Sequence, residues 1–173
     1  MSHLNRRVLL ISILTFSPIA IADNQESKVK VGFIYNFIKL TAPVKSIADS
    51  YHLCMAGNSS LDKDLIYLNQ KMAHGKPIEV IRVSLTSSTL TGCDSLFIGK
   101  IAKKRQLITL IDHAISQKIL TISEAGHSLD KRVIIDLKQL AGKVRFDINL
   151  ATAQQSDIAL NANLLRLAHN VLQ

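Results

Sequence analysis

The sequence lacks the short motifs that mark the common enzyme classes. It has no G-x-S-x-G turn, H-E-x-x-H helix, C-x-x-C pair, Walker loop or G-x-G-x-x-G turn. Its histidines are scattered without the spacing of metal ligands, and neither cysteine has a histidine or second cysteine at zinc-ligand spacing. Apart from His3 near the N-terminus, these histidines are His52, His74, His113, His127 and His169. We therefore expect a protein that is not an enzyme and that uses no cofactor or metal.

Beyond the N-terminus, the sequence also lacks an apolar run long enough to cross a membrane. The N-terminus has a positive head with Arg6 and Arg7, an apolar stretch over 8–22, and an A-x-A site at 20–22. This pattern predicts a secretory signal peptide over residues 1–22, cleaved after Ala22. A membrane anchor is the alternative, but the stretch is shorter than the ~20 residues that a span needs. Export by the Sec or the twin-arginine route stays open.

The remaining residues, 23–173, have the length of one domain with a sizeable core. Cleavage removes Arg6 and Arg7, so the mature chain is still basic, two charges below the +8 of the full sequence. Because an exported protein does not normally meet chromosomes, we interpret this charge as solubility or attraction to anionic surfaces. No nucleic-acid partner is expected.

Only two cysteines are present, Cys54 and Cys93. Cys54 lies in an apolar run that predicts a buried strand, and Cys93 directly precedes a second such run. If these strands are neighbours, the two sulfurs can meet, and an oxidising compartment lets the bond persist. We predict one structural disulfide; a zinc ligand pair and a catalytic thiol are the alternatives, without support from spacing.

Apolar periodicity predicts helices that alternate with strands. The expected helices cover 29–40, 60–72, 102–117 and 161–172, and the expected strands cover 51–57, 78–83, 95–99, 119–122, 132–137 and 144–148. The strands with Leu53, Leu96 and Leu120 should be parallel, and the last two strands should form an antiparallel pair. The sequence thus predicts an α/β fold, a single domain with a mixed β-sheet of about six strands flanked by helices.

Two surface features allow a functional interpretation beside a structural one. Gly57, Gly99 and Gly126 each follow a strand, so they either shape a ligand cleft at one sheet edge or simply permit short turns. The run of basic residues at 100–105 lies at the first turns of a helix, the unfavourable end for its dipole. It is either a solvated face or a contact for a membrane surface or an anionic partner.

Six segments, taken in order, resemble the motifs of the YfiR family over nearly the whole mature chain. They are Lys30–Lys39, Leu53–Gly57, Cys93–Ile98, Ile119–Ser123, Val144–Asn149 and Leu164–Ala168. The resemblance implies a periplasmic, non-enzymatic protein that represses a membrane-anchored, YfiN-like diguanylate cyclase by binding its periplasmic part. Release by a YfiB-like outer-membrane lipoprotein would then raise cyclic di-GMP and promote biofilm formation.

The resemblance also implies a partner-binding surface on the last two strands. Family repressors use an acidic residue at the position of Asp147 and an apolar one near Ile135, and Arg145 would lie beside them. A weak ion pair between Arg145 and Asp147 is the structural alternative. The chain departs from the family at 41–43, where an acidic-Trp-Pro ending is often found, and it has no second cysteine pair.

Two function classes follow from the sequence. One is the cyclase repressor, and the other is a periplasmic small-molecule binding module with a different partner. An exposed apolar cluster on the late strands would favour the first, and a deep cleft at the glycine turns would favour the second. The oligomeric state, a homodimer included, stays open.

Overall fold

The computed structural model describes residues 19–42, 48–85, 90–124 and 132–173, with only the backbone for 19–24. Most of the predicted signal peptide therefore lies outside the described residues, and so does Gly126. The first helix, α1 (Ile19–Leu40), begins before the predicted cleavage point and ends where Thr41 was expected to stop it. None of the described helices combines the length and apolarity needed to cross a bilayer.

All eight described strands form one mixed sheet. Its order is β2-β3-β1-β4-β5-β6-β7-β8. The strands are β1 (Tyr51–Ala56), β2 (Met72–Ala73), β3 (Lys76–Arg82), β4 (Ser95–Ile98), β5 (Leu120–Glu124), β6 (Ile135–Leu140), β7 (Lys143–Asn149) and β8 (Asn170–Leu172). Strands β3, β1, β4, β5 and β6 run parallel, whereas β6 and β7 form an antiparallel hairpin. This confirms the expected mixed α/β architecture.

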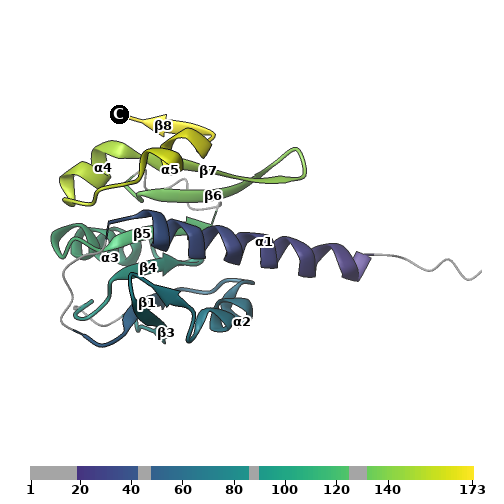
Figure 1. Ribbon diagram of the computed structural model, residues 1–173, viewed down its shortest axis with the longest axis horizontal. Coiled ribbons are helices and arrows are strands. Elements are labelled where there is room, and N and C mark those ends of the chain that lie inside the picture. The colour runs from purple at the N-terminus through teal and green to yellow at the C-terminus, as the bar shows by residue number, and fades with distance from the viewer. Residues whose placement is uncertain (1–18, 43–47, 86–89, 125–131) are drawn as a thin grey trace, which may run out of the picture.

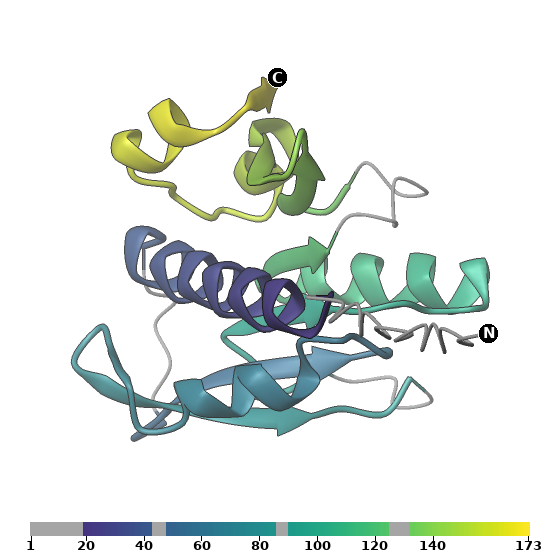
Figure 2. The ribbon, with the colours of Figure 1, turned by 90° about the vertical axis from the view of Figure 1, so that its right-hand side faces the viewer.

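Both faces of the central strands are buried, which explains their continuous apolar sequences. In β1, Leu53 and Met55 belong to the core on the α1 side, and Cys54 and Ala56 belong to the core on the other side. There, α3 (Lys104–Ser116) packs with its apolar stripe, which includes Leu107, Leu110 and Ile111. Figure 2 shows α1 and α3 as separate layers.

Helix α1 lies lengthwise between the C-terminal elements and the blue part of the chain with β1, β3 and α2 (Asp62–Leu65) (Figure 1). Phe33 and Phe37 of α1 contact Phe146 of β7, with ring centroids 5.7 and 4.8 Å apart. Aromatic pairs at such distances add to the burial of their rings. The N-terminal helix and the late hairpin therefore share one core.

The expected count of about six strands was too low, because two short edge strands, β2 and β8, were not predicted. The predicted helix over 60–72 is limited to α2 and the short turn η1 (Ile66–Leu68), and β2 begins at Met72. The predicted last helix ends at Leu167 as α5 (Ala162–Leu167), since Ala168 is extended with ψ 143°. Residues 170–172 instead pair with β7. A further short helix, α4 (Leu150–Gln155), was not predicted; Asn149 caps it through a hydrogen bond from the Thr152 N–H.

Candidate partner-binding surface

The hairpin β6–β7 and the edge strand β8 present one polar sheet face, which we call the β6–β8 face. Register places Asp147 between Asp136 of β6 and Asn170 of β8, and Arg145 opposite Lys138. Because side chains alternate across a strand, these residues point away from the core formed by Leu137, Phe146 and Ile148. All of them are at least partly exposed. The face is therefore available to a partner.

Asp147 is held by neighbours on other strands rather than by Arg145. Its carboxylate forms an ion pair with Lys138 and accepts a hydrogen bond of 3.2 Å from the Asn170 side-chain amide. His169 Nδ1 lies 3.4 Å from the same carboxylate. The Asp147 side chain is only 20% exposed, so its orientation is fixed before any partner arrives. Arg145 is exposed on the same strand, and no described residue forms an ion pair with it.

Ile135 does not belong to this face. Its side chain is fully buried and pairs in register with Ile148, so it forms part of the core on the α1 side. Contact between Ile135 and a partner stays a prediction, and it would require this side chain to leave the core, because the alternation of side chains along β6 turns Ile135 inward.

Two leucines that the sequence analysis missed supply apolar surface to the β6–β8 face. Leu140, at the end of β6, is 39% exposed, and Leu172, in β8, is 46% exposed. By register they lie on the same face as Lys138 and Asp147. The face is therefore charged in the middle and apolar toward its ends. Leu172 was missed because it fitted the periodicity of a helix.

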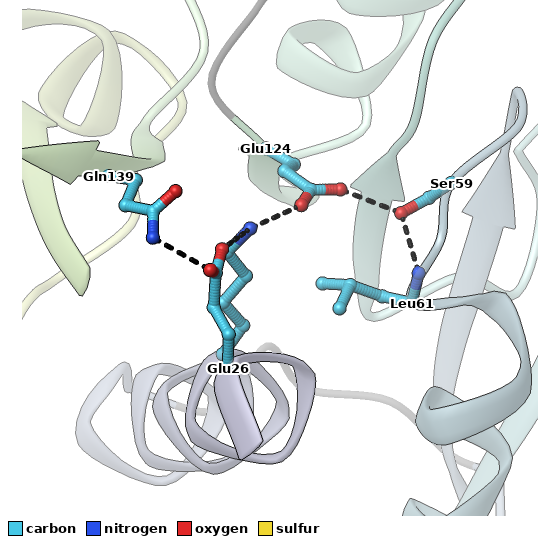
Figure 3. A network of polar contacts seen from close by, with 6 residues as sticks. Glu26, Ser59, Leu61, Glu124 and Gln139 are labelled. Atoms are coloured by element: carbon cyan, nitrogen blue, oxygen red, sulfur yellow. Dashed lines mark hydrogen bonds and ion pairs between the residues drawn. The ribbon is translucent and has the colours of Figure 1, made fainter. Parts of the chain in front are cut away.

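A second polar cluster, also missed, joins four segments at the other side of the hairpin. Lys30 Nζ lies 2.7 Å from a carboxylate oxygen of Glu26 and 2.7 Å from one of Glu124. The other Glu124 oxygen accepts from the Ser59 hydroxyl, and Glu26 accepts from the Gln139 amide, both at 2.7 Å. Figure 3 shows how these side chains converge from α1, β5, β6 and the β1–α2 turn. Only the Glu26–Lys30 spacing was visible in the sequence.

Lys30 is the centre of this cluster, with a side chain only 12% exposed. Burial lowers the pKa of Lys30, but the hydrogen bonds and charges of Glu124 and Glu26 outweigh this effect, so the pKa is raised above 10.5. Lys30 is therefore a stable cation. Among the described residues, no group of His, Cys, Asp and Glu side chains is arranged to hold a metal ion. We interpret the cluster as a structural link.

The glycine turns at the sheet edge approach each other too closely for a cleft between them. A Cβ atom on Gly99 would lie 2.7 Å from the Asn58 carbonyl, and one on Gly57 would lie 2.9 Å from the Gly99 oxygen. The Asn58 and Lys100 backbones also exchange hydrogen bonds of 3.1 and 2.7 Å. Glycine is needed at both positions because the Cβ atom of any other residue would collide with the backbone of the neighbouring turn.

A surface hollow of about 490 Å³ lies elsewhere, lined by Lys28, Val31, Asp64 and Tyr67. It combines an aromatic ring with one cationic and one anionic side chain. Its apolar part is small, consisting of Val31 and the ring of Tyr67.

Cys54 and Cys93 form a disulfide in the structure, with Cα atoms 5.7 Å apart. Strand β1 pairs in parallel with β4, which places Cys54 opposite Leu96 and brings Cys93 within reach. Asp94 supports this approach, since its carboxylate accepts a 2.7 Å hydrogen bond from the His52 N–H. The bond therefore links β1 to the segment that leads into β4.

A family model described as YfiR/HmsC-like matches residues 27–169 of the chain. No protein with a curated description matches the sequence. Nine chains of solved structures match, among them the ABC domain in complex with L-Trp from Streptococcus pneumonia, at 13% identity and a TM-score of 0.56. That match covers 85% of this chain and 62% of the other, so the chain spans less than two thirds of that structure. At this identity the likeness concerns the fold alone.

Proposed function

The chain belongs to the YfiR/HmsC-like family, and from this membership we propose that it is a periplasmic regulator of cyclic di-GMP signalling. It binds the periplasmic part of a membrane-anchored diguanylate cyclase and represses the enzyme without catalysing a reaction itself. An outer-membrane lipoprotein relieves this repression, and biofilm formation then increases.

The observation that supports a partner-binding role is the geometry of the β6–β8 face. Asp147 is oriented by Lys138 and Asn170 but keeps part of its carboxylate in solvent. Exposed Leu140 and Leu172 lie toward the ends of the same face, Leu140 opposite Lys143 and Leu172 opposite Asn149. A fixed charge that shares a face with exposed apolar side chains can be desolvated by a partner at little entropic cost, which is the arrangement found at interface hot spots.

The proposal is tested by reversing the charge of Asp147. We expect Asp147→Lys to weaken binding to the purified periplasmic part of the cyclase by about 2–5 kcal/mol, because a buried charge contact would become repulsive. Asp147→Asn should weaken it less, since the amide keeps the shape and can still hydrogen-bond Asn170. In cells without the wild-type copy, Asp147→Lys should raise cyclic di-GMP.

Glu79→Lys is the matched control, because Glu79 is another strand carboxylate, 57% exposed, on β3 at the other side of the sheet. Thermal melting of all variants separates binding from folding. If Asp147→Lys melts normally and still holds cyclic di-GMP at the wild-type level, the β6–β8 face does not repress the cyclase.

The second function class, a small-molecule binding module, is supported by the hollow that Lys28 and Tyr67 line. L-tryptophan is a suitable probe, because it has an aromatic ring and both charges of a zwitterion, and the ABC domain with the related fold holds it. Calorimetric binding that Tyr67→Ala abolishes, together with unchanged repression by that variant, would favour this class.

A further inference from the structure

Four exposed basic side chains lie at the start of α3 or just before it, and we call them the basic cluster: Lys100, Lys103, Lys104 and Arg105. All four are exposed, and none has an ion-pair partner among the described residues. The first turn of α3 contains no acidic residue, and Lys103 caps the helix without a side-chain hydrogen bond. The cluster is thus a concentrated positive charge without a counter-charge of its own.

The stability of the fold does not explain this cluster. Positive charges at a helix N-terminus oppose the helix dipole, and four neighbouring cations repel each other. Acidic or capping residues would stabilise α3 better at these positions. A charge pattern that costs stability indicates a role outside folding.

The structure holds the base of the cluster rigidly at the carboxyl end of the parallel strands. The Lys100 and Asn58 backbones are paired by two hydrogen bonds, and the next residue, Ser59, reaches Glu124 at the end of β5. Glu124 in turn binds Lys30 of α1. The part of α1 around Lys30 therefore lies at the same sheet edge as the base of the cluster.

We propose that the basic cluster docks the protein onto an anionic phospholipid bilayer. Lysine ammonium groups bind phosphate headgroups as point charges, and several cations near one anionic surface act together. The cluster follows β4 in the middle of the sheet, whereas the β6–β8 face lies at one end of it. Lipid contact therefore leaves the β6–β8 face free. It also keeps the protein at the membrane in which the partner of the proposed function is anchored.

Vesicle flotation with the full mature chain tests this inference, without any cyclase in the assay. The two probes are vesicles of phosphatidylcholine alone and vesicles of equal parts phosphatidylglycerol and phosphatidylcholine. We expect binding only to the second, weakening as salt is raised. Each neutralised cation should lower the partition coefficient about fivefold, so Lys103→Gln with Lys104→Gln should lower it about 25-fold.

Lys39→Gln with Lys71→Gln is the matched control, since both lysines are exposed and lie outside the cluster and the β6–β8 face. It removes the same net charge and should weaken binding far less. If both double variants lose vesicle binding equally, the attraction depends on net charge alone and the proposal is overturned. A wild-type protein that does not bind the phosphatidylglycerol vesicles would also overturn it. If vesicles fail but the cluster variants lose affinity for the periplasmic part of the cyclase, the cluster is a protein contact instead.

Discussion

Substitution of Lys30 tests how much the polar cluster of Glu26, Lys30 and Glu124 contributes to the stability of the fold. Lys30→Met keeps the length of the side chain but removes the ammonium, so Glu26 and Glu124 remain as neighbouring carboxylates without their shared cation. With these two side chains 28% and 20% exposed, the cluster lies between a surface pair and a buried one. Exposed ion pairs contribute about 0–1 kcal/mol, and breaking a fully buried pair costs about 3–5 kcal/mol.

We therefore expect Lys30→Met to lower the free energy of unfolding by about 2 kcal/mol. For a domain of this size this corresponds to a fall in melting temperature of about 4–8 °C. Adding Glu124→Gln removes one of the uncompensated charges, so the double variant should be more stable than the sum of the single changes predicts. A coupling energy of about 1–2 kcal/mol is the expected result of this cycle.

The matched control is Lys118→Met, which breaks the 2.8 Å ion pair with Asp157. Those side chains are 57% and 78% exposed, so water screens the pair and the melting temperature should not change measurably. Urea unfolding of the wild type, Lys30→Met, Glu124→Gln, the double variant and Lys118→Met gives the free energies of unfolding, and thermal melting of the same five proteins gives the melting temperatures. A Lys30→Met variant that unfolds like the wild type, or a coupling energy of zero, would refute the reasoning.

The raised pKa of Lys30 adds a dependence on pH. Since the folded-state pKa lies above 10.5, the ammonium contributes its full stabilisation below that pH and loses it as the pH rises through the raised value. The stability difference between the wild type and Lys30→Met should be constant from pH 7 to 9 and shrink above about pH 10.5. A difference that already shrinks between pH 7 and 9 would contradict this assignment.

Three further predictions concern the disulfide, two glycines and export. Replacing Cys54 and Cys93 by alanine should lower the stability by about 4 kcal/mol, because the bond closes a separation of 39 residues; coincident melting curves would contradict this. Gly99→Ala should destabilise the protein, since its Cβ would lie 2.7 Å from a backbone carbonyl. Gly32 is a residue of α1 with nothing within 4 Å of an added Cβ, so Gly32→Ala should stabilise the protein by about 0.5–1 kcal/mol. The melting temperatures of the two variants test both predictions. Mass spectrometry of the exported protein should show cleavage after Ala22, and an intact N-terminus would refute it.

The central strands could be predicted from the sequence because their apolar runs report burial on both faces. Leu53 in β1 and Leu96 in β4 lie in short apolar runs bounded by turn residues, and parallel pairing follows from the helices between strands. The alternation from Val144 to Ile148 likewise identified β7. Local sequence was sufficient to predict those strands whose own apolar residues are buried in the core.

The edges of the sheet could not be predicted in this way. Val171 and Leu172 fit a helical stripe, yet pairing with β7 provides them with backbone hydrogen bonds that no local pattern reveals. The polar cluster around Lys30 was hidden for a similar reason, since Glu124 is 94 residues away in the sequence. Ile135 was assigned to the surface by resemblance, and only the register of β6 with β7 shows that it faces the core.

The contact of Phe33 and Phe37 with Phe146 has a consequence for biogenesis if the chain is exported by the Sec route, in which an unfolded chain crosses the inner membrane with its N-terminus first. Most of the polypeptide must then be translocated before Phe146 can reach α1. Until that moment the part of α1 that packs against β7 lacks its cover and is prone to aggregation. On this route the fold is completed only after β7 has been translocated, and α1 is the segment that a chaperone would have to protect.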